Sequence, residues 1–258
     1  ALSLLGEPLS ALQAVDAALI VLDGQTGVRT ELSRLWARIE ELGLPCVFFL
    51  NGLDRDGASI ERALEICRTQ LNCLPIPMVV PVGLGLQMEG VIDVLQERFI
   101  RSGPSAAKVE LLPVPAHLES AVKERRIKLI EAVAENEDAL LDAYVAQGDL
   151  SQEALFSGLR SGILSRHVFP LYAGSAVRNL GVWPLLNAIA ALLPSPDERC
   201  AVHPAQGVRV EANQPCERTG SAQEPFSAYV FKTLIDPFVG RLSFCRLLSG
   251  TVQADSLV

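Results

Sequence analysis

Residues 46–54 read Cys46-Val47-Phe48-Phe49-Leu50-Asn51-Gly52-Leu53-Asp54, an apolar run that stops at a polar edge. Apolar residues without a polar break are typical of a parallel strand that other elements cover on both faces. In open α/β sheets, ligands bind beyond the carboxyl ends of the strands. At that end Asn51 and Asp54 offer an amide that can hold loops together and a carboxylate that can accept two parallel N–H bonds from a planar base edge. The stretch therefore predicts a base-binding site after a buried strand.

The same two residues also have a purely structural interpretation. Asn and Asp are common turn formers, and Asp54-Arg55-Asp56-Gly57 turns the chain directly after the strand. The stretch alone leaves both interpretations open, so the rest of the chain has to decide between them.

The segments around this strand alternate between strand and helix patterns. The predicted strands span residues 17–22, 75–82 and 168–173, and the predicted helices span residues 32–42, 60–71 and 182–193. Such an alternation predicts a doubly wound α/β domain. The prolines of the 75–82 segment indicate an edge strand or an irregular start.

Two parts of the chain depart from this alternation. Residues 85–165 carry mainly helical periodicity, with Gly148 ending one helix and Ser151 capping the next. Residues 197–224 are polar and aperiodic, which predicts a linker. Beyond them, two strands are expected at 226–234 and 241–248, as at the start of an antiparallel barrel.

Composition limits the classes of function. A net charge of −8 over 258 residues argues against a broad basic surface for nucleic acid, and no DNA partner is expected. No apolar run reaches the length of a membrane span. The six cysteines form no C-x-x-C pair, so we expect buried free thiols in a reducing cytoplasm. The chain begins at Ala1 and ends within a strand pattern at Val258, and we expect it to be part of a longer protein.

Three motifs then occur in one order: Asn51-Gly52-Leu53-Asp54, Gly174-Ser175-Ala176 and Asp236-Pro237-Phe238-Val239-Gly240-Arg241-Leu242. With the helical insertion between the first two, this set resembles translational GTPases, most closely elongation factor G or an elongation-factor-G-like paralogue. The resemblance implies a P-loop-NTPase-like doubly wound sheet lacking its N-terminal part, a helical insertion, and an incomplete antiparallel β-barrel.

The resemblance also implies a division of the chain. Its segments are the C-terminal part of the GTPase sheet (1–84), the mainly helical insertion (85–165), the end of the GTPase domain (166–196), the linker (197–224) and the start of the barrel (225–258).

The resemblance implies roles for four residues. Asp54 would accept hydrogen bonds from the N1–H and the amino group of guanine, and Asn51 would bond the base and brace the loops. Ser175 and Ala176 match the segment that presents a backbone N–H to the guanine O6. Because adenine offers an acceptor where guanine offers N1–H, an acceptor-only carboxylate would reject adenine.

The sequence departs from the family in two ways. Gly52 replaces a lysine that lies along the base, which predicts weaker guanine binding and a gain in affinity for Gly52→Lys. No G-x-x-x-x-G-K-[ST] loop is present, so the residues that bind the phosphates and Mg²⁺ are expected before Ala1. The chain by itself is therefore predicted not to hydrolyse GTP.

Two functions follow from the resemblance. The first is a cytoplasmic GTP hydrolase that couples GTP turnover to ribosomal translocation or recycling, and Asn51, Asp54 and Ser175 favour it. The second is a degenerate GTPase fold that binds the ribosome or another partner with weak or no turnover, and Gly52 favours it. A release-factor or ribosomal-protection relative is a further member of the same family. The resemblance implies contacts with ribosomal RNA, with Lys232 and Arg241 as candidates, and with the ribosomal stalk protein.

Overall fold

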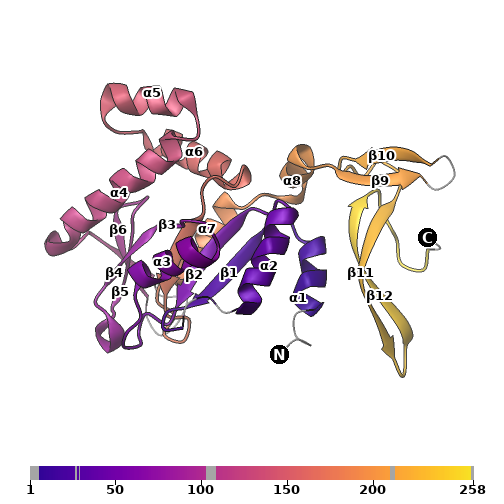
Figure 1. Cartoon of the computed structure of the whole chain (residues 1–258), viewed down its shortest axis with the longest axis horizontal. Coiled ribbons are helices and arrows are strands. Elements are labelled where there is room, and N and C mark those ends of the chain that lie inside the picture. The colour runs from indigo at the N-terminus through magenta and orange to yellow at the C-terminus, as the bar shows by residue number, and fades with distance from the viewer. Residues whose placement is uncertain (1–5, 27, 29, 103–108, 210–212, 257–258) are drawn as a thin grey trace. The chain divides into compact units, whose positions relative to one another are not determined.

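The computed structural model describes residues 6–26, 28, 30–102, 109–209 and 213–256. Contacts divide the chain into two compact units, and the larger one comprises Ala17–Ala37 and Gly43–Leu193. The smaller unit takes the rest of the described chain (Figure 1). None of the described helices has the length and apolar character needed to cross a membrane.

A four-stranded parallel sheet forms the centre of the larger unit. Its order is β1 (Ala18–Asp23), β2 (Cys46–Asn51), β8 (Pro170–Gly174) and β3 (Ile76–Pro77). The predicted strand at 46–50 is confirmed as β2, and all five of these residues are buried. The predicted α/β class is confirmed as well, with antiparallel sheets in addition to the parallel one.

Helices connect the parallel strands. α2 (Thr30–Glu41) joins β1 to β2, and α3 (Ile60–Gln70) leads from β2 to β3. Because such crossovers are right-handed and both run in the same direction across the sheet, α2 and α3 cover the same face. α7 (Val182–Leu192) follows β8.

An aromatic cluster fastens α2 to the sheet. The Trp36 ring centroid lies 5.7 Å from that of Phe48 on β2 and 5.6 Å from that of Phe169, the residue before β8. Phe48 is completely buried. The tilted and edge-on ring geometries are those that aromatic pairs prefer, so the cluster ties a helix to two neighbouring strands.

The prediction of one continuous strand at 75–82 is wrong, because the segment forms two short strands in different sheets. β3 belongs to the parallel sheet, whereas β4 (Val79–Val82) belongs to an antiparallel one. Met78 lies between them: its N–H donates to the carbonyl of Leu171, and its carbonyl accepts from the N–H of Val94. Proline cannot donate to a ladder, so the proline-rich run supports only short pairings on each side of Met78.

The predicted insertion begins with strands rather than helices. β4 pairs with β5 (Gly90–Asp93), followed in the sheet by β6 (Arg98–Ser102) and β7 (Val109–Leu112). The sequence Gly90-Val91-Ile92-Asp93-Val94 predicts only one short strand in this region. The short apolar runs lack the length of a helix, and their pairing with one another is not visible in the periodicity.

The helices expected after these strands are present. They are α4 (Glu119–Ala134), α5 (Asp138–Gln147) and α6 (Gln152–Leu164), and Figure 1 shows α5 at the top of the view with α4 and α6 below it. Gly148 ends α5 in a left-handed conformation, and the Ser151 hydroxyl accepts from the N–H of Ala154 at the start of α6. Both helix boundaries match the sequence prediction. Single 3₁₀ turns, η3 (Gly85–Gln87) and η4 (Ala116–Leu118), lie between the other elements.

The linker predicted at 197–224 is wrong, because this segment has regular structure. It contains α8 (Pro196–Val202) and the hairpin formed by β9 (Ala205–Arg209) and β10 (Gln214–Arg218). A capping box starts α8: the Ser195 hydroxyl accepts from the Glu198 N–H, and the Glu198 carboxylate accepts from the Ser195 N–H. The Pro194-Ser195-Pro196 run predicts the end of the preceding helix, and α7 does end at Leu192. The run also starts α8, because Pro196 occupies its first turn.

The two strands expected beyond residue 225 are confirmed. β11 (Ser227–Asp236) and β12 (Gly240–Ser249) form a long antiparallel hairpin. The same unit contains α1 (Gly6–Ala11) and η2 (Leu12–Ala14). The sequence pattern predicts a helix from Leu4 to Val15, and its first residues, Leu4 and Leu5, lie outside the described residues.

The six cysteines are free of disulfides, but only some of them are buried. Cys46, Cys67 and Cys73 are buried, Cys200 and Cys216 are half-buried, and Cys245 is exposed. The expectation of buried thiols is therefore wrong for the three cysteines of the smaller unit.

Candidate functional site

Three strand ends meet at one level of the parallel sheet. Asp23 at the end of β1 is paired in register with Asn51 at the end of β2, and Asn51 is paired with Gly174 at the end of β8. Backbone bonds continue beyond the strands: the Gly24 N–H donates to the Asn51 carbonyl at 2.8 Å, and the Gly52 N–H to the Gly174 carbonyl at 2.9 Å. The loops that follow these strands are therefore held side by side at the carboxyl edge, where α/β folds bind ligands.

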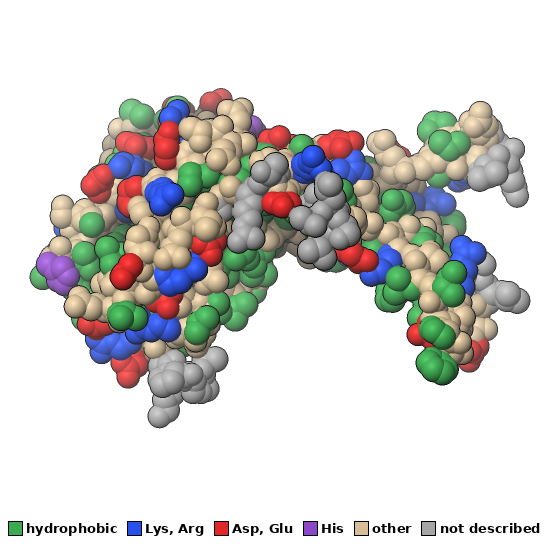
Figure 2. Space-filling model, turned by 60° about the horizontal axis from the view of Figure 1, so that its bottom comes forward, with side chains coloured by type: hydrophobic (Ala, Val, Ile, Leu, Met, Phe, Trp, Pro, Cys, Tyr) green, Lys and Arg blue, Asp and Glu red, His purple; other side chains and the backbone are tan. Residues whose placement is uncertain are grey.

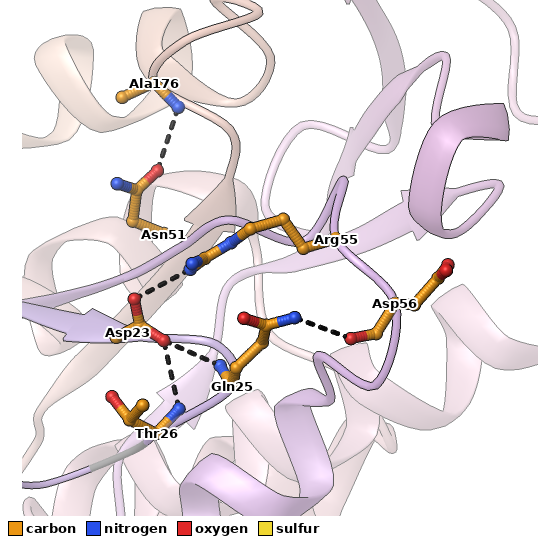
Figure 3. A network of polar contacts seen from close by, with 7 residues as sticks. All are labelled: Asp23, Gln25, Thr26, Asn51, Arg55, Asp56 and Ala176. Atoms are coloured by element: carbon orange, nitrogen blue, oxygen red, sulfur yellow. Dashed lines mark hydrogen bonds and ion pairs between the residues drawn. The ribbon is translucent and has the colours of Figure 1, made fainter.

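Asn51 connects two of these loops through its side chain. Its Oδ1 accepts from the Ala176 N–H at 2.9 Å, across 125 positions of sequence (Figure 3). An asparagine amide also carries two N–H donors on Nδ2, which this bond does not use. The structure thus brings Asn51 and Ala176 together, as the two motifs predicted.

The loop after β8 closes on itself. The Ser175 and Leu180 backbones exchange two hydrogen bonds of 2.9 Å, and the buried Ser175 hydroxyl accepts from the Arg178 N–H. A Cβ on Gly174 would lie 2.0 Å from the Leu180 carbonyl oxygen, so the close approach requires glycine. Since Ala176 donates its N–H to Asn51 in this arrangement, a base carbonyl would bind at that N–H only by exchanging with Asn51.

Asp54 lies in the turn directly after the strand end. Leu53 before it is buried, and its N–H donates to the Gly174 carbonyl at 3.0 Å. Asp54 itself is half-buried. No described residue forms a hydrogen bond or ion pair with its carboxylate, which leaves its oxygens available as acceptors for a ligand.

An ion pair at this edge was not predicted from the sequence. The Arg55 Nη2 lies 2.8 Å from the Asp23 Oδ2, and the Asp23 Oδ1 accepts from the N–H groups of Gln25 and Thr26 at 2.9 and 3.0 Å (Figure 3). The hydrogen bond from Arg55, followed by those from the two backbone N–H groups, holds the pKa of the Asp23 carboxyl far below its ordinary value. Asp23 is therefore a fixed anion that holds the Arg55 guanidinium in place.

Gly52 lies against this guanidinium. Gly52 has a φ of +85°, and a Cβ there would lie 2.2 Å from the Arg55 Nη2 and 2.5 Å from its Nε. Residues with side chains rarely adopt such a φ. The space that a side chain at position 52 would enter is thus occupied by Arg55.

The turn that carries Arg55 is tied to the loop after β1. The Gln25 Nε2 donates to the Asp56 carbonyl at 2.8 Å (Figure 3). The sequence Asp23-Gly24-Gln25-Thr26-Gly27 predicts a loop after β1, of which Gly27 lies outside the described residues. The residue types of this loop and of the turn that contains Arg55 predict turns and no ion pair. One feature of the sequence could have pointed to Arg55: it is a cation three positions after Gly52, where the family has a lysine.

Metal-ligating side chains do not cluster in the described part of the chain: no group of three or more His, Cys, Asp and Glu side chains there is arranged to hold a metal ion. What the end of β2 and the turn after it offer is a set of polar groups: the Asp54 carboxylate, the Asn51 amide and the Arg55 guanidinium.

Comparison with known proteins identifies the family. The model of the elongation factor Tu GTP binding domain matches residues 5–195. A crystal structure of a Thermus thermophilus protein is similar with a TM-score of 0.76 and 30% identity, over 95% of this chain and 33% of that chain. The present chain therefore spans about a third of that protein's length. On the extent of the domain match, the chain belongs to the elongation factor Tu GTP-binding domain family of translational GTP-binding factors.

Proposed function

We propose that this chain supplies the guanine-recognition part of a translation factor that resembles elongation factor G. The observation that carries the proposal is the bond between the Asn51 amide and the Ala176 N–H at the aligned ends of β2 and β8. It joins the two motifs that the family resemblance assigns to the base. The simple turn interpretation of Asn51 does not account for a bond to a loop so distant in sequence.

Each polar group has a role in this proposal. The Asp54 carboxylate accepts from the guanine N1–H and amino group, because it has free acceptor capacity at the strand end. The Asn51 Nδ2 donates to an acceptor on the base, while its Oδ1 braces the loop of Ser175 and Ala176. Ser175 acts from within the protein, since its side chain is buried.

The wider activity is part of the proposal as well. The full-length protein would bind GTP or GDP with Mg²⁺, couple GTP hydrolysis to ribosomal translocation or recycling, and contact ribosomal RNA and the stalk protein. Of the two candidates for RNA contact, Arg241 is exposed, whereas Lys232 forms an ion pair with Glu7.

A second function is favoured by one observation. The base site lacks the lysine of the family and has Gly52 in its place. A degenerate GTPase fold that binds the ribosome or another partner, with weak or no turnover, would tolerate this loss. Multiple-turnover GTP hydrolysis by the full-length protein with ribosomes separates the two: turnover supports the factor, and tight ribosome binding without turnover supports the binding module.

The guanine assignment is tested by Asp54→Asn in the full-length protein. Xanthine carries a carbonyl where guanine carries the amino group, and an Asn amide can donate to that carbonyl while accepting from N1–H. We expect the ratio of GDP to XDP affinity to fall by about ten- to a hundredfold, the range for hydrogen bonds to charged groups. Asp56→Asn, two residues later in the same turn, is the matched control. An unchanged GDP/XDP ratio in Asp54→Asn would remove Asp54 from the base site.

A further inference from the structure

Arg55 occupies the position that the side chain of residue 52 would take. The guanidinium approaches the Cα of Gly52 so closely that a Cβ there would clash with its Nη2, Nε and Cζ. The Arg55 side chain remains 42% exposed, so one part of it faces solvent at the edge of the site. In Figure 3 its side chain extends from the turn after β2 toward Asp23 at the end of β1.

We propose that Arg55 replaces the missing lysine: its guanidinium, lying over Gly52 and held by Asp23, covers one face of the bound guanine. The inference rests on the proposed function and names a further residue of the same site. It also makes Gly52 and Arg55 a compensating pair, because the guanidinium in its present position leaves no room for a side chain at residue 52.

The chemistry of a guanidinium suits this role. It is planar and always charged, it is more weakly hydrated than an ammonium, and it stacks on aromatic faces. A cation over a ring face is attracted by the ring's quadrupole. The Asp23 carboxylate uses one oxygen for Arg55 and the other for two backbone N–H groups, so it fixes the guanidinium before a ligand arrives.

The proposal reverses the expectation for Gly52→Lys. The sequence alone predicted that a lysine at this position would tighten guanine binding. In the structure, that lysine would meet the Arg55 guanidinium and would have to adopt a φ of +85°. We now expect Gly52→Lys to weaken GDP binding when Arg55 is present and to restore part of the binding when Arg55 is removed.

The test is calorimetric titration of the full-length protein with GDP and XDP. The variants are Arg55→Ala, Asp23→Asn, Gly52→Lys and the double variant Gly52→Lys/Arg55→Ala. Arg68→Ala is the matched control, because Arg68 also pairs with a carboxylate, that of Glu65 on α3, but lies outside the site. If Arg55→Ala does not fold, as judged by thermal unfolding, Arg55→Gln replaces it, since Gln keeps part of the stem and a planar end without the charge.

Arg55→Ala is expected to weaken GDP binding by about three- to thirtyfold. The GDP/XDP ratio should stay unchanged, because a contact to the ring face does not read the donors on its edge. Asp23→Asn should weaken binding less, because the guanidinium is still present and the Asn oxygen can accept from the same two N–H groups. The double variant should bind GDP more tightly than either single variant, and Arg68→Ala should match the wild type.

Three results would overturn the role of Arg55. The first is wild-type GDP affinity in Arg55→Ala. The second is an equal loss in Asp23→Asn and Arg55→Ala, which would make Arg55 a brace for the β1 loop. The third is an effect of Gly52→Lys that is the same with and without Arg55. These results leave the guanine assignment intact, whereas a wild-type protein that binds no GDP overturns the proposed function and the inference together.

Discussion

Strand β2 and the hairpin β11–β12 both carry several large apolar side chains, but these side chains have opposite surroundings. All residues of Cys46–Leu50 are buried, between β1 and β8 in the sheet. In the hairpin, large apolar side chains are exposed along most of its length, up to 95% for Phe238, and Figure 2 shows apolar side chains on its surface. The difference teaches that an apolar run predicts a strand, while the neighbouring elements decide whether that strand is part of a core.

The comparison has an energetic consequence. Burial of apolar surface is the dominant favourable term in folding, and β2 obtains it from the helices and strands around it. A two-stranded hairpin by itself is at best marginally stable in water. Within the smaller unit, two ion pairs fasten the hairpin to the N-terminal segment: Arg246 pairs with Asp16, and Lys232 pairs with Glu7.

The largest expected difference between the two regions follows when a phenylalanine ring is removed from each of them and the free energy of unfolding is measured. Phe48→Ala should lower the free energy of unfolding of the larger unit by about 3–5 kcal/mol, because it leaves a cavity beside Trp36. Phe238→Ala at the hairpin turn should change stability by no more than about 0.5 kcal/mol. Denaturant titrations of the two variants measure both effects. Equal losses would mean that Phe238 is packed in solution.

The same contrast explains how much of the fold could be predicted from the sequence. Cys46–Leu50 was predictable because an uninterrupted apolar run ending at Asn51 has few other interpretations. The change of sheet at Met78 was not, because it depends on the partners Leu171 and Val94, which are distant along the chain. Helix α8 is hard to predict for a local reason: the Pro194-Ser195-Pro196 run that follows the end of α7 also contains the residues that start α8.

The candidate site divides in a similar way. Asn51 and Ala176 were predicted from motif chemistry, and the structure brings them together. Asp23 and Arg55 were missed because each is an ordinary turn residue in its own segment. They belong to the site because the register between β1 and β2 places Asp23 opposite Asn51.

Hydrogen exchange of backbone amides is a second test of the difference between the buried strands and the hairpin, with an expected effect of intermediate size. Amides of β2 and β8 should exchange at least about tenfold more slowly than those of β11–β12, because core strands open only on global unfolding whereas weakly packed elements open locally. Both ladders are hydrogen-bonded along most of their length, so the difference reports packing rather than pairing. Equal protection, independent of protein concentration, would show that the hairpin docks on other parts of the same chain.

The smallest expected effects concern two aspartates at strand ends, Asp93 in the larger unit and Asp236 in the hairpin. Their carboxyl pKa values are shifted in opposite directions. Burial raises the pKa of the Asp93 carboxyl above its ordinary 3.8, although it accepts from the Gln96 N–H. The pKa of the Asp236 carboxyl is lowered, because it accepts from the N–H groups of Val239 and Phe238. Burial thus shifts the titration of Asp93 toward the neutral form, whereas hydrogen bonds from the backbone shift that of Asp236 toward the charged form.

The two substitutions by asparagine should therefore act in opposite directions at neutral pH. Because the folded pKa of Asp93 is raised, its ionisation costs stability as pH rises through that pKa, and Asp93→Asn should raise the melting temperature at neutral pH. Because the folded pKa of Asp236 is lowered, its contribution is present above the ordinary pKa and is lost as pH falls, so Asp236→Asn should slightly speed exchange at the hairpin turn. Both differences from the wild type should shrink below about pH 4, where the unfolded carboxyl is protonated as well. Melting curves of Asp93→Asn and amide exchange of Asp236→Asn, both recorded between acid and neutral pH, measure these two differences. If Asp93→Asn lowers the melting temperature at neutral pH, the charge on Asp93, and not only its acceptor oxygens, supports the turn after β5.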